Sequence, residues 1–120
     1  MADDATTVSA LRDRVAAFVR ERDWEKYHRP ANLAKAISVE AAELLELFQW
    51  KTDEDVDLRD AKFREALEDE LADVLVYCLS AANAAGIDLS DAVLRKLERN
   101  EARYPADEWR GRAREAPREP

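Results

Sequence analysis

The sequence has very few of the residues that build disulfides, zinc sites and loops. Its 120 residues include one cysteine, one histidine, two glycines and four prolines. One cysteine cannot form an intrachain disulfide or a thiolate cluster for zinc, and one histidine cannot supply a pair of zinc ligands. A low content of glycine and proline beside abundant Ala, Leu, Glu and Arg favours helices. We therefore predict an all-α fold in a single domain.

Long apolar runs and excess positive charge are also missing. The longest apolar run, Val74 to Ala82, is too short to cross a membrane, and the acidic first residues are unlike a signal peptide. We expect a cytoplasmic protein without a membrane partner. The 27 acidic and 19 basic residues give a net charge of −8, which argues against binding a nucleic-acid polymer. A small phosphorylated ligand stays compatible with this charge if a bound metal ion neutralises it.

The apolar residues recur with a helical period in four segments, which lie at about residues 7–22, 32–50, 60–86 and 88–103. Asn32 is expected to cap the second helix, Gly86 to close the third and Pro105 to prevent continuation of the fourth. The short links favour antiparallel neighbours. We predict an antiparallel four-helix bundle over residues 1–105, followed by a flexible charged tail, 106–120. Trp109 is the one candidate anchor of this tail, and a neighbouring subunit is its suggested partner.

Two pairs of acidic residues fall where the helices should be apolar. Glu40 and Glu43 share one face of the second predicted helix, and Glu70 and Asp73 share one face of the third. Carboxylates drawn into apolar surroundings are costly unless they are protonated, paired or metal-bound. Oxygen ligands alone suit Mg²⁺ or Mn²⁺. The phase of these residues leaves two readings open, a metal site and a set of solvated boundary residues.

A second polar set recurs at steps of four on the last helix, as Lys96, Asn100 and Tyr104. The lysine offers a point charge suited to phosphate, and the asparagine offers a donor and acceptors for a base or sugar edge. A lysine stem that covers apolar surface would explain the same pattern without a ligand.

Aromatic residues lie close to the acidic pairs in the sequence. Trp24, His28 and Trp50 flank the first pair, and Tyr77 follows Asp73 by one turn. Flat rings can sandwich a nucleobase, whereas in a small helical protein they also serve as ordinary core.

These residues occur in four motifs that resemble the MazG-type nucleotide pyrophosphohydrolases, and more narrowly their single-domain dCTP pyrophosphatase branch. The motifs are Trp24-x-x-x-His28-x-Pro30-x-Asn32, Glu40-Ala-Ala-Glu43-Leu-Leu-Glu-Leu-Phe-Gln-Trp50, Glu70-Leu-Ala-Asp73-Val-Leu-Val-Tyr77 and Lys96-x-x-x-Asn100-x-x-x-Tyr104-Pro105. The resemblance extends from about Trp24 to Pro105, so it implies nothing about the structure or function of the tail after Pro105.

The resemblance implies a role for each of these positions. Four carboxylates would bind Mg²⁺, with Mn²⁺ as a substitute, and would act with Lys96 in catalysis: Glu40, Glu43, Glu70 and Asp73. Eight residues would bind the substrate: Trp24, His28, Asn32, Trp50, Tyr77, Lys96, Asn100 and Tyr104. The family cleaves nucleoside triphosphates between the α and β phosphates, and its members assemble as dimers or tetramers.

We therefore expect a metal-dependent nucleoside triphosphate pyrophosphatase that acts on dCTP or a modified cytosine deoxynucleotide and cleanses the nucleotide pool. We expect a homo-oligomer, and we favour a tetramer built as a dimer of dimers over a simple dimer. The alternative is a non-catalytic helical module that binds nucleotide or metal. A protein of that kind would be stabilised by Mg²⁺ and nucleotide but would not hydrolyse the nucleotide.

Overall fold

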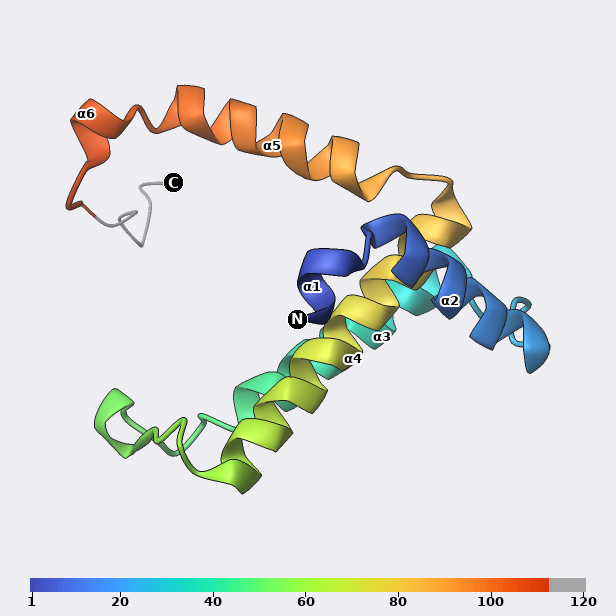
Figure 1. Cartoon of the computed structure of the whole chain (residues 1–120), viewed down its shortest axis with the longest axis horizontal. Coiled ribbons are helices and arrows are strands. Elements are labelled where there is room, and N and C mark those ends of the chain that lie inside the picture. Colours follow the sequence, from blue (N-terminus) through green and yellow to red (C-terminus); the bar gives the residue numbers. More distant parts are fainter. Residues whose placement is uncertain (113–120) are drawn as a thin grey trace. The chain divides into compact units, whose positions relative to one another are not determined.

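The computed structural model describes residues 1–112, and every regular element within them is helical, which confirms the all-α prediction (Figure 1). Four helices form the body of the chain: α2 (Val8–Glu21), α3 (Pro30–Glu46), α4 (Ala61–Ala85) and α5 (Leu89–Arg103). Three shorter elements were not predicted: α1 (Ala2–Ala5), η1 (Asp53–Asp55) and α6 (Ala106–Trp109). The chain divides into one unit over Met1–Ile87 and a second that begins at Asp88, and each is described by itself.

The first residues of three predicted segments, at positions 7, 60 and 88, are the N-caps of α2, α4 and α5. The Thr7 hydroxyl accepts a hydrogen bond from the amide of Ala10 at 3.0 Å, and Asp60 and Asp88 cap α4 and α5 in the same way. Gly86 closes α4 with φ of +65°, a left-handed conformation that glycine adopts without steric cost.

The predicted bounds of α3 were wrong at both ends. The helix begins at Pro30 with Arg29 as its N-cap, and the Asn32 side chain instead donates to the carbonyl oxygen of Tyr27 at 3.1 Å. It ends at Glu46, because the amides of residues 47–49 bond three residues back and tighten the chain into turns. These turns place the Phe48 ring edge-on against Phe63 of α4, with centroids 5.4 Å apart.

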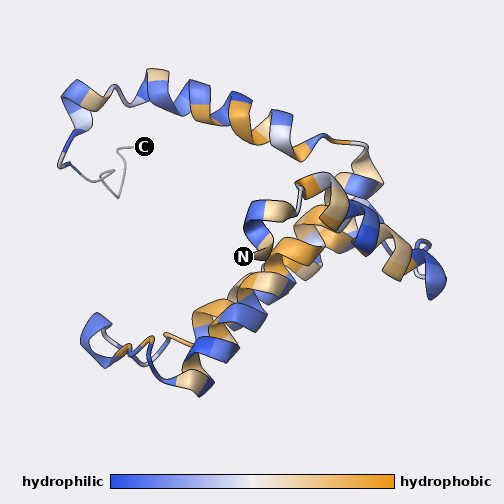
Figure 2. Ribbon diagram, in the orientation of Figure 1, coloured by the Kyte–Doolittle hydropathy of each residue, from blue (hydrophilic) through white to orange (hydrophobic). Residues whose placement is uncertain are grey.

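The core lies where α2 and α3 pack against α4, and the contact between α3 and α4 is the more extensive. The prediction that these two helices pair as antiparallel neighbours is confirmed (Figure 1). Four apolar residues are buried in this unit: Val19, Leu33, Leu79 and Ala82. Figure 2 shows that α4 is hydrophilic in its first turns and apolar in its C-terminal half. The core therefore gathers at one end of α4, and the acidic residues lie toward the other.

One polar pair also joins α2 to α4. Arg12 Nε donates to Asn83 Oδ1 at 3.0 Å, and Asn83 Nδ2 donates to the carbonyl oxygen of Arg12 at 3.1 Å. Both groups are partly buried, so each bond is shielded from competing water. The pair fixes the side chain of Asn83 beside the core.

In the second unit, the apolar residues Val93, Leu94 and Leu97 of α5 are exposed. Trp109 of α6 packs edge-on against Tyr104, with ring centroids 5.1 Å apart. Trp109 therefore has a ring partner within its own unit, and an anchoring contact with a neighbouring subunit stays a prediction. Most of the predicted tail, residues 113–120, lies outside the described residues.

No single helix among residues 1–112 is both long enough and apolar enough to cross a membrane. Only α4 and α5 taken together across the break at Gly86 reach that length and composition.

We predict that replacing Gly86 by alanine destabilises the first unit by about 1–2 kcal/mol, because an L-residue is strained at φ of +65°. A Cβ at this position would meet nothing within 4 Å, so a clash does not contribute. Gly86→Asn should lower the free energy of unfolding less than Gly86→Ala does, because asparagine tolerates the left-handed region. Urea denaturation followed by circular dichroism measures both, and equal losses would contradict the conformational explanation.

Candidate metal centre and ligand cleft

Three of the four predicted carboxylates meet between α3 and α4. Glu40, Glu43 and Glu70 are half-buried, and one carboxylate oxygen from each lies within 4.8 Å of the others. Glu40 and Glu43 share a face of α3 because they are three residues apart, and the antiparallel pairing of α4 brings Glu70 opposite them. Asp73 lies almost one turn beyond Glu70 and is exposed. It borders the cluster, and its negative charge acts on both Glu40 and Glu70.

The cluster is electrostatically unbalanced. None of the four carboxylates forms an ion pair with a lysine or arginine of the described chain. Burial, a hydrogen bond with Glu43, and the charges of Glu43, Asp73 and Glu70 raise the pKa of Glu40 to about 7. Burial and the charges of Glu43 and Asp73 also raise the pKa of Glu70. The cluster therefore requires either a proton or a cation near neutral pH.

Two oxygen atoms of the cluster lack a partner. Within the described residues, Glu40 Oε2 and Glu70 Oε2 are buried and accept no hydrogen bond. Buried carboxylate oxygens are normally satisfied by donors or by metal ions. All the ligand atoms here are oxygens, so the donor set fits a hard divalent cation such as Mg²⁺ or Mn²⁺.

Two of the predicted base-binding residues lie together. The rings of His28 and Tyr77 have centroids 6.4 Å apart and are tilted by 31°. Trp24 instead packs edge-on against Phe18 at 5.8 Å, and Trp50 is 88 % exposed in the turns after α3. In the described part of the chain neither tryptophan makes a ring contact with His28 or Tyr77.

The remaining predicted substrate-binding residues divide between the two units. Asn32 is exposed in the first turn of α3, where it holds the preceding loop. Lys96 and Asn100 share one face of α5 in the second unit, and Tyr104 is the C-cap residue of that helix. Lys96 is exposed and the other two are half-buried.

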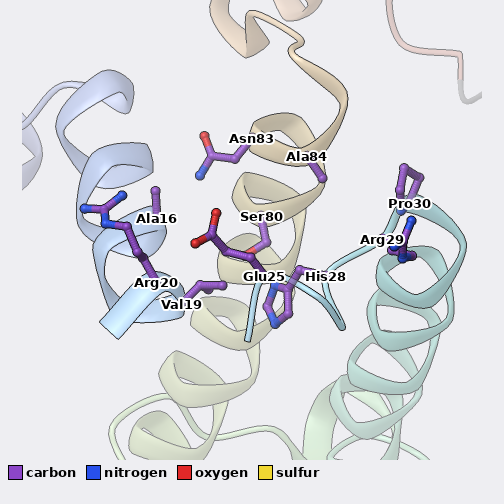
Figure 3. A pocket seen from close by; sticks show the side chains of 10 residues that line it. All are labelled: Ala16, Val19, Arg20, Glu25, His28, Arg29, Pro30, Ser80, Asn83 and Ala84. Carbon is purple, nitrogen blue, oxygen red and sulfur yellow. The ribbon is translucent and has the colours of Figure 1, made fainter. Parts of the chain in front are cut away.

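A cleft of about 410 Å³ lies among α2, the loop before α3 and the C-terminal turns of α4 (Figure 3). His28 is the one predicted site residue that lines it. The other lining residues are Ala16, Val19, Arg20, Glu25, Arg29, Pro30, Ser80, Asn83 and Ala84. The polar residues Ser80 and Asn83, set among alanines on the apolar end of α4, were the available signal in the sequence for this cleft. The loop conformation that brings Glu25 to them could not be predicted.

We predict that the metal-free protein loses stability as pH rises from about 4.5 to about 7. The unfolded chain ionises Glu40 near its ordinary pKa of 4.5, whereas the folded chain retains the proton up to about pH 7. The free energy gained from the protonated form is therefore lost over this interval. Glu40→Gln, which keeps the shape and removes the charge, should flatten the decline and raise the melting temperature at pH 8.

The measurement is thermal unfolding in the presence of a chelator between pH 4.5 and 8, for the wild type and for Glu40→Gln. Mg²⁺ should restore stability to the wild type at pH 8 and have a smaller effect on the variant. Parallel curves for the two proteins would contradict the assignment of this titration to Glu40.

Comparison with known proteins connects this geometry to a family. The profile of the MazG-like family matches residues 35–116. The chain is 43 % identical over 109 residues to dCTP pyrophosphatase 1 of Bos taurus, and 46 % identical over 102 residues to that of Homo sapiens. These matches cover 89 % and 83 % of this chain, but only 64 % and 60 % of the two relatives.

The fold agrees with a solved structure as well. The crystal structure of a pyrophosphatase from Archaeoglobus fulgidus superposes with a TM-score of 0.67 at 42 % identity, over 78 % of this chain and 87 % of that one. The family match extends over more than half of the chain, and it confirms the predicted resemblance to the MazG-type family. This chain belongs to the MazG-like family.

Proposed function

We propose that this protein is a metal-dependent nucleoside triphosphate pyrophosphohydrolase, which converts dCTP or a modified cytosine deoxynucleotide to the monophosphate and pyrophosphate. The observation that carries the proposal is the meeting of three half-buried carboxylates that form no ion pair with a lysine or arginine of residues 1–112. The identity to dCTP pyrophosphatase 1 of Bos taurus and Homo sapiens supports both the reaction and the base. Removal of unwanted nucleotides from the cellular pool is the corresponding biological role.

The helical domain of residues 1–105 would supply every group for this reaction. Glu40, Glu43, Glu70 and Asp73 would hold Mg²⁺ or Mn²⁺, and a divalent cation held there neutralises phosphate charge and lowers the pKa of a bound water. Asp73 is the exposed member of the set.

The other site residues would bind and orient the nucleotide. Lys96 would offset the charge of the leaving pyrophosphate, and Asn100 and Tyr104 would hydrogen-bond the sugar or phosphates. Water attacks the α-phosphorus, and the bond to the oxygen bridging the α and β phosphates breaks, so one water is consumed for each pyrophosphate released. Stacking at the base would come from His28 and Tyr77. Trp24, Asn32 and Trp50 stay predicted binding residues, and within the described chain neither tryptophan contacts this ring pair.

We predict that Glu43→Gln and Asp73→Asn each reduce turnover by at least about 100-fold, because loss of a residue that supports a metal ligand already costs 10- to 100-fold. Glu65→Gln is the matched control, since Glu65 is exposed on α4 and lies outside the cluster. The assay follows dCMP and pyrophosphate from dCTP and Mg²⁺, with circular dichroism to verify folding. Full activity in both variants would exclude the cluster as the catalytic centre.

The proposed assembly is a dimer of dimers or a dimer, each protomer contributing an antiparallel four-helix bundle. Its support is the amount of large apolar surface left exposed on α3 and α4 beside a small core. This surface is formed by Val39, Leu45, Leu71, Leu75 and Val76.

Light scattering should therefore give a mass of two or four chains of 13.7 kDa. Replacing Leu71 and Leu75 together by glutamate should lower the mass, because charge would be buried at the contact. Leu58→Glu, in the connection before α4, should leave the mass unchanged. A wild-type monomer at micromolar concentration would contradict the proposed assembly.

A further inference from the structure

The cleft beside α2 contains a buried hydroxyl group without a hydrogen-bond partner. Ser80 is 4 % exposed, and its Oγ atom bonds to no group of the described chain. Serine in a helix can donate to the carbonyl four residues earlier, as Ser38 does to Ala34 at 3.0 Å. Ser80 does not make this bond, so its hydroxyl is free to face the cleft that it lines. A buried hydroxyl without a hydrogen-bond partner destabilises the folded protein, and a bound ligand that hydrogen-bonds to it would remove this cost.

A second unpartnered atom borders the same cleft. Nδ1 of His28 is buried and has no hydrogen-bond partner among the described residues. The uncharged polar side chain of Asn83, which also lines the cleft, is satisfied, because Arg12 binds both its oxygen and its nitrogen. The unused hydrogen-bonding capacity of the buried wall therefore belongs to His28 and Ser80.

The position of Ser80 relative to the acidic cluster matches the length of a nucleoside. Asp73, Tyr77 and Ser80 lie on one face of α4, at steps of four and three residues. The seven residues from Asp73 to Ser80 span about 10 Å along the helix axis. A nucleotide whose phosphates lie at the carboxylates would pass Tyr77 and bring its base toward Ser80. His28 connects the two regions, because its ring faces Tyr77 and also lines the cleft.

A carboxylate gives this cleft a chemical preference. Glu25 extends from the loop before α3 into the space between α2 and α4, on the side where Ser80 lies (Figure 3). It forms no ion pair within the described chain, although Arg20 and Arg29 also line the cleft. A carboxylate only accepts hydrogen bonds, whereas a serine hydroxyl can donate one.

We propose that this cleft receives the nucleobase and that Ser80 and Glu25 are specificity-determining residues, which select a base with an exocyclic amino group beside a ring nitrogen. The amino group donates to Glu25, and the ring nitrogen accepts a hydrogen bond from Ser80. Cytosine presents this edge. Uracil presents a carbonyl oxygen in place of the amino group, and that oxygen faces Glu25 unfavourably. The inference rests on the proposed function and assigns to base selection two residues that the family motifs do not specify.

The comparison of dCTP with dUTP isolates this edge, because the two nucleotides share sugar and phosphates. We expect Ser80→Ala to raise KM for dCTP about 5- to 10-fold with little change in kcat, as loss of one hydrogen bond predicts. The melting temperature of the ligand-free variant should equal or exceed that of the wild type, since the removed hydroxyl has no partner. Glu25→Gln should lower the ratio of kcat/KM for dCTP over dUTP by about 10-fold, because an amide can donate to the carbonyl of uracil.

Two matched variants control for the substitutions themselves. Ser38→Ala removes a hydroxyl that is bonded within its own helix, and Glu21→Gln removes a charge at the exposed end of α2. Neither residue lines the cleft, so both variants should retain the wild-type KM and base preference.

Calorimetric titration with dCMP and dUMP separates this inference from the proposed activity. If no triphosphate is hydrolysed but Ser80→Ala still weakens dCMP binding, the proposed activity fails and the base cleft stands. If dCTP yields dCMP and pyrophosphate while Ser80→Ala and Glu25→Gln retain the wild-type KM and base ratio, the activity stands and the base cleft is overturned. Equal binding of dCMP and dUMP by the wild type would also overturn it.

Discussion

Repulsion among the carboxylates between α3 and α4 is the constraint on which the rest of the structure depends. The most extensive helix contact in the first unit is also the one that brings Glu40, Glu43 and Glu70 together. Apolar packing at the other end of α4 must offset that repulsion, and the buried residues available for it are few. Cation binding would therefore be linked to folding, because an ion that neutralises the cluster would also remove the repulsion that opposes the pairing of α3 with α4.

The placement of the acids was predictable because helical phase depends only on local sequence. The periodicity of α3 and α4, together with the predicted antiparallel pairing of these helices, was enough to place Glu40, Glu43 and Glu70 on facing surfaces. The caps at Thr7, Asp60 and Asp88 and the glycine at position 86 were local features of the same kind. Each depends on the backbone within a few residues of itself.

The features that escaped prediction depend on contacts between distant residues or on unusual backbone conformations. The end of α3 at Glu46 accompanies the packing of Phe48 against Phe63, which no local rule anticipates. The loop before α3 turns at Asp23, a residue other than glycine with φ of +56°. That loop brings Glu25 to the cleft, so the lining of the cleft could be found only in three dimensions. The prediction of Asn32 as a helix cap was wrong because its side chain donates to the carbonyl oxygen of Tyr27 in the preceding loop instead.

The pair formed by Arg12 and Asn83 has a consequence for the uniqueness of the fold. Where α2 meets α4 the side chains include several alanines, and small smooth surfaces allow one helix to slide along another with little change in buried area. Two hydrogen bonds that require one fixed alignment remove this freedom, because a shift by one turn would break both. The pair thus sets the register of α2 on α4. In a protein with so small a core, polar geometry selects the native alignment among others of similar hydrophobic content.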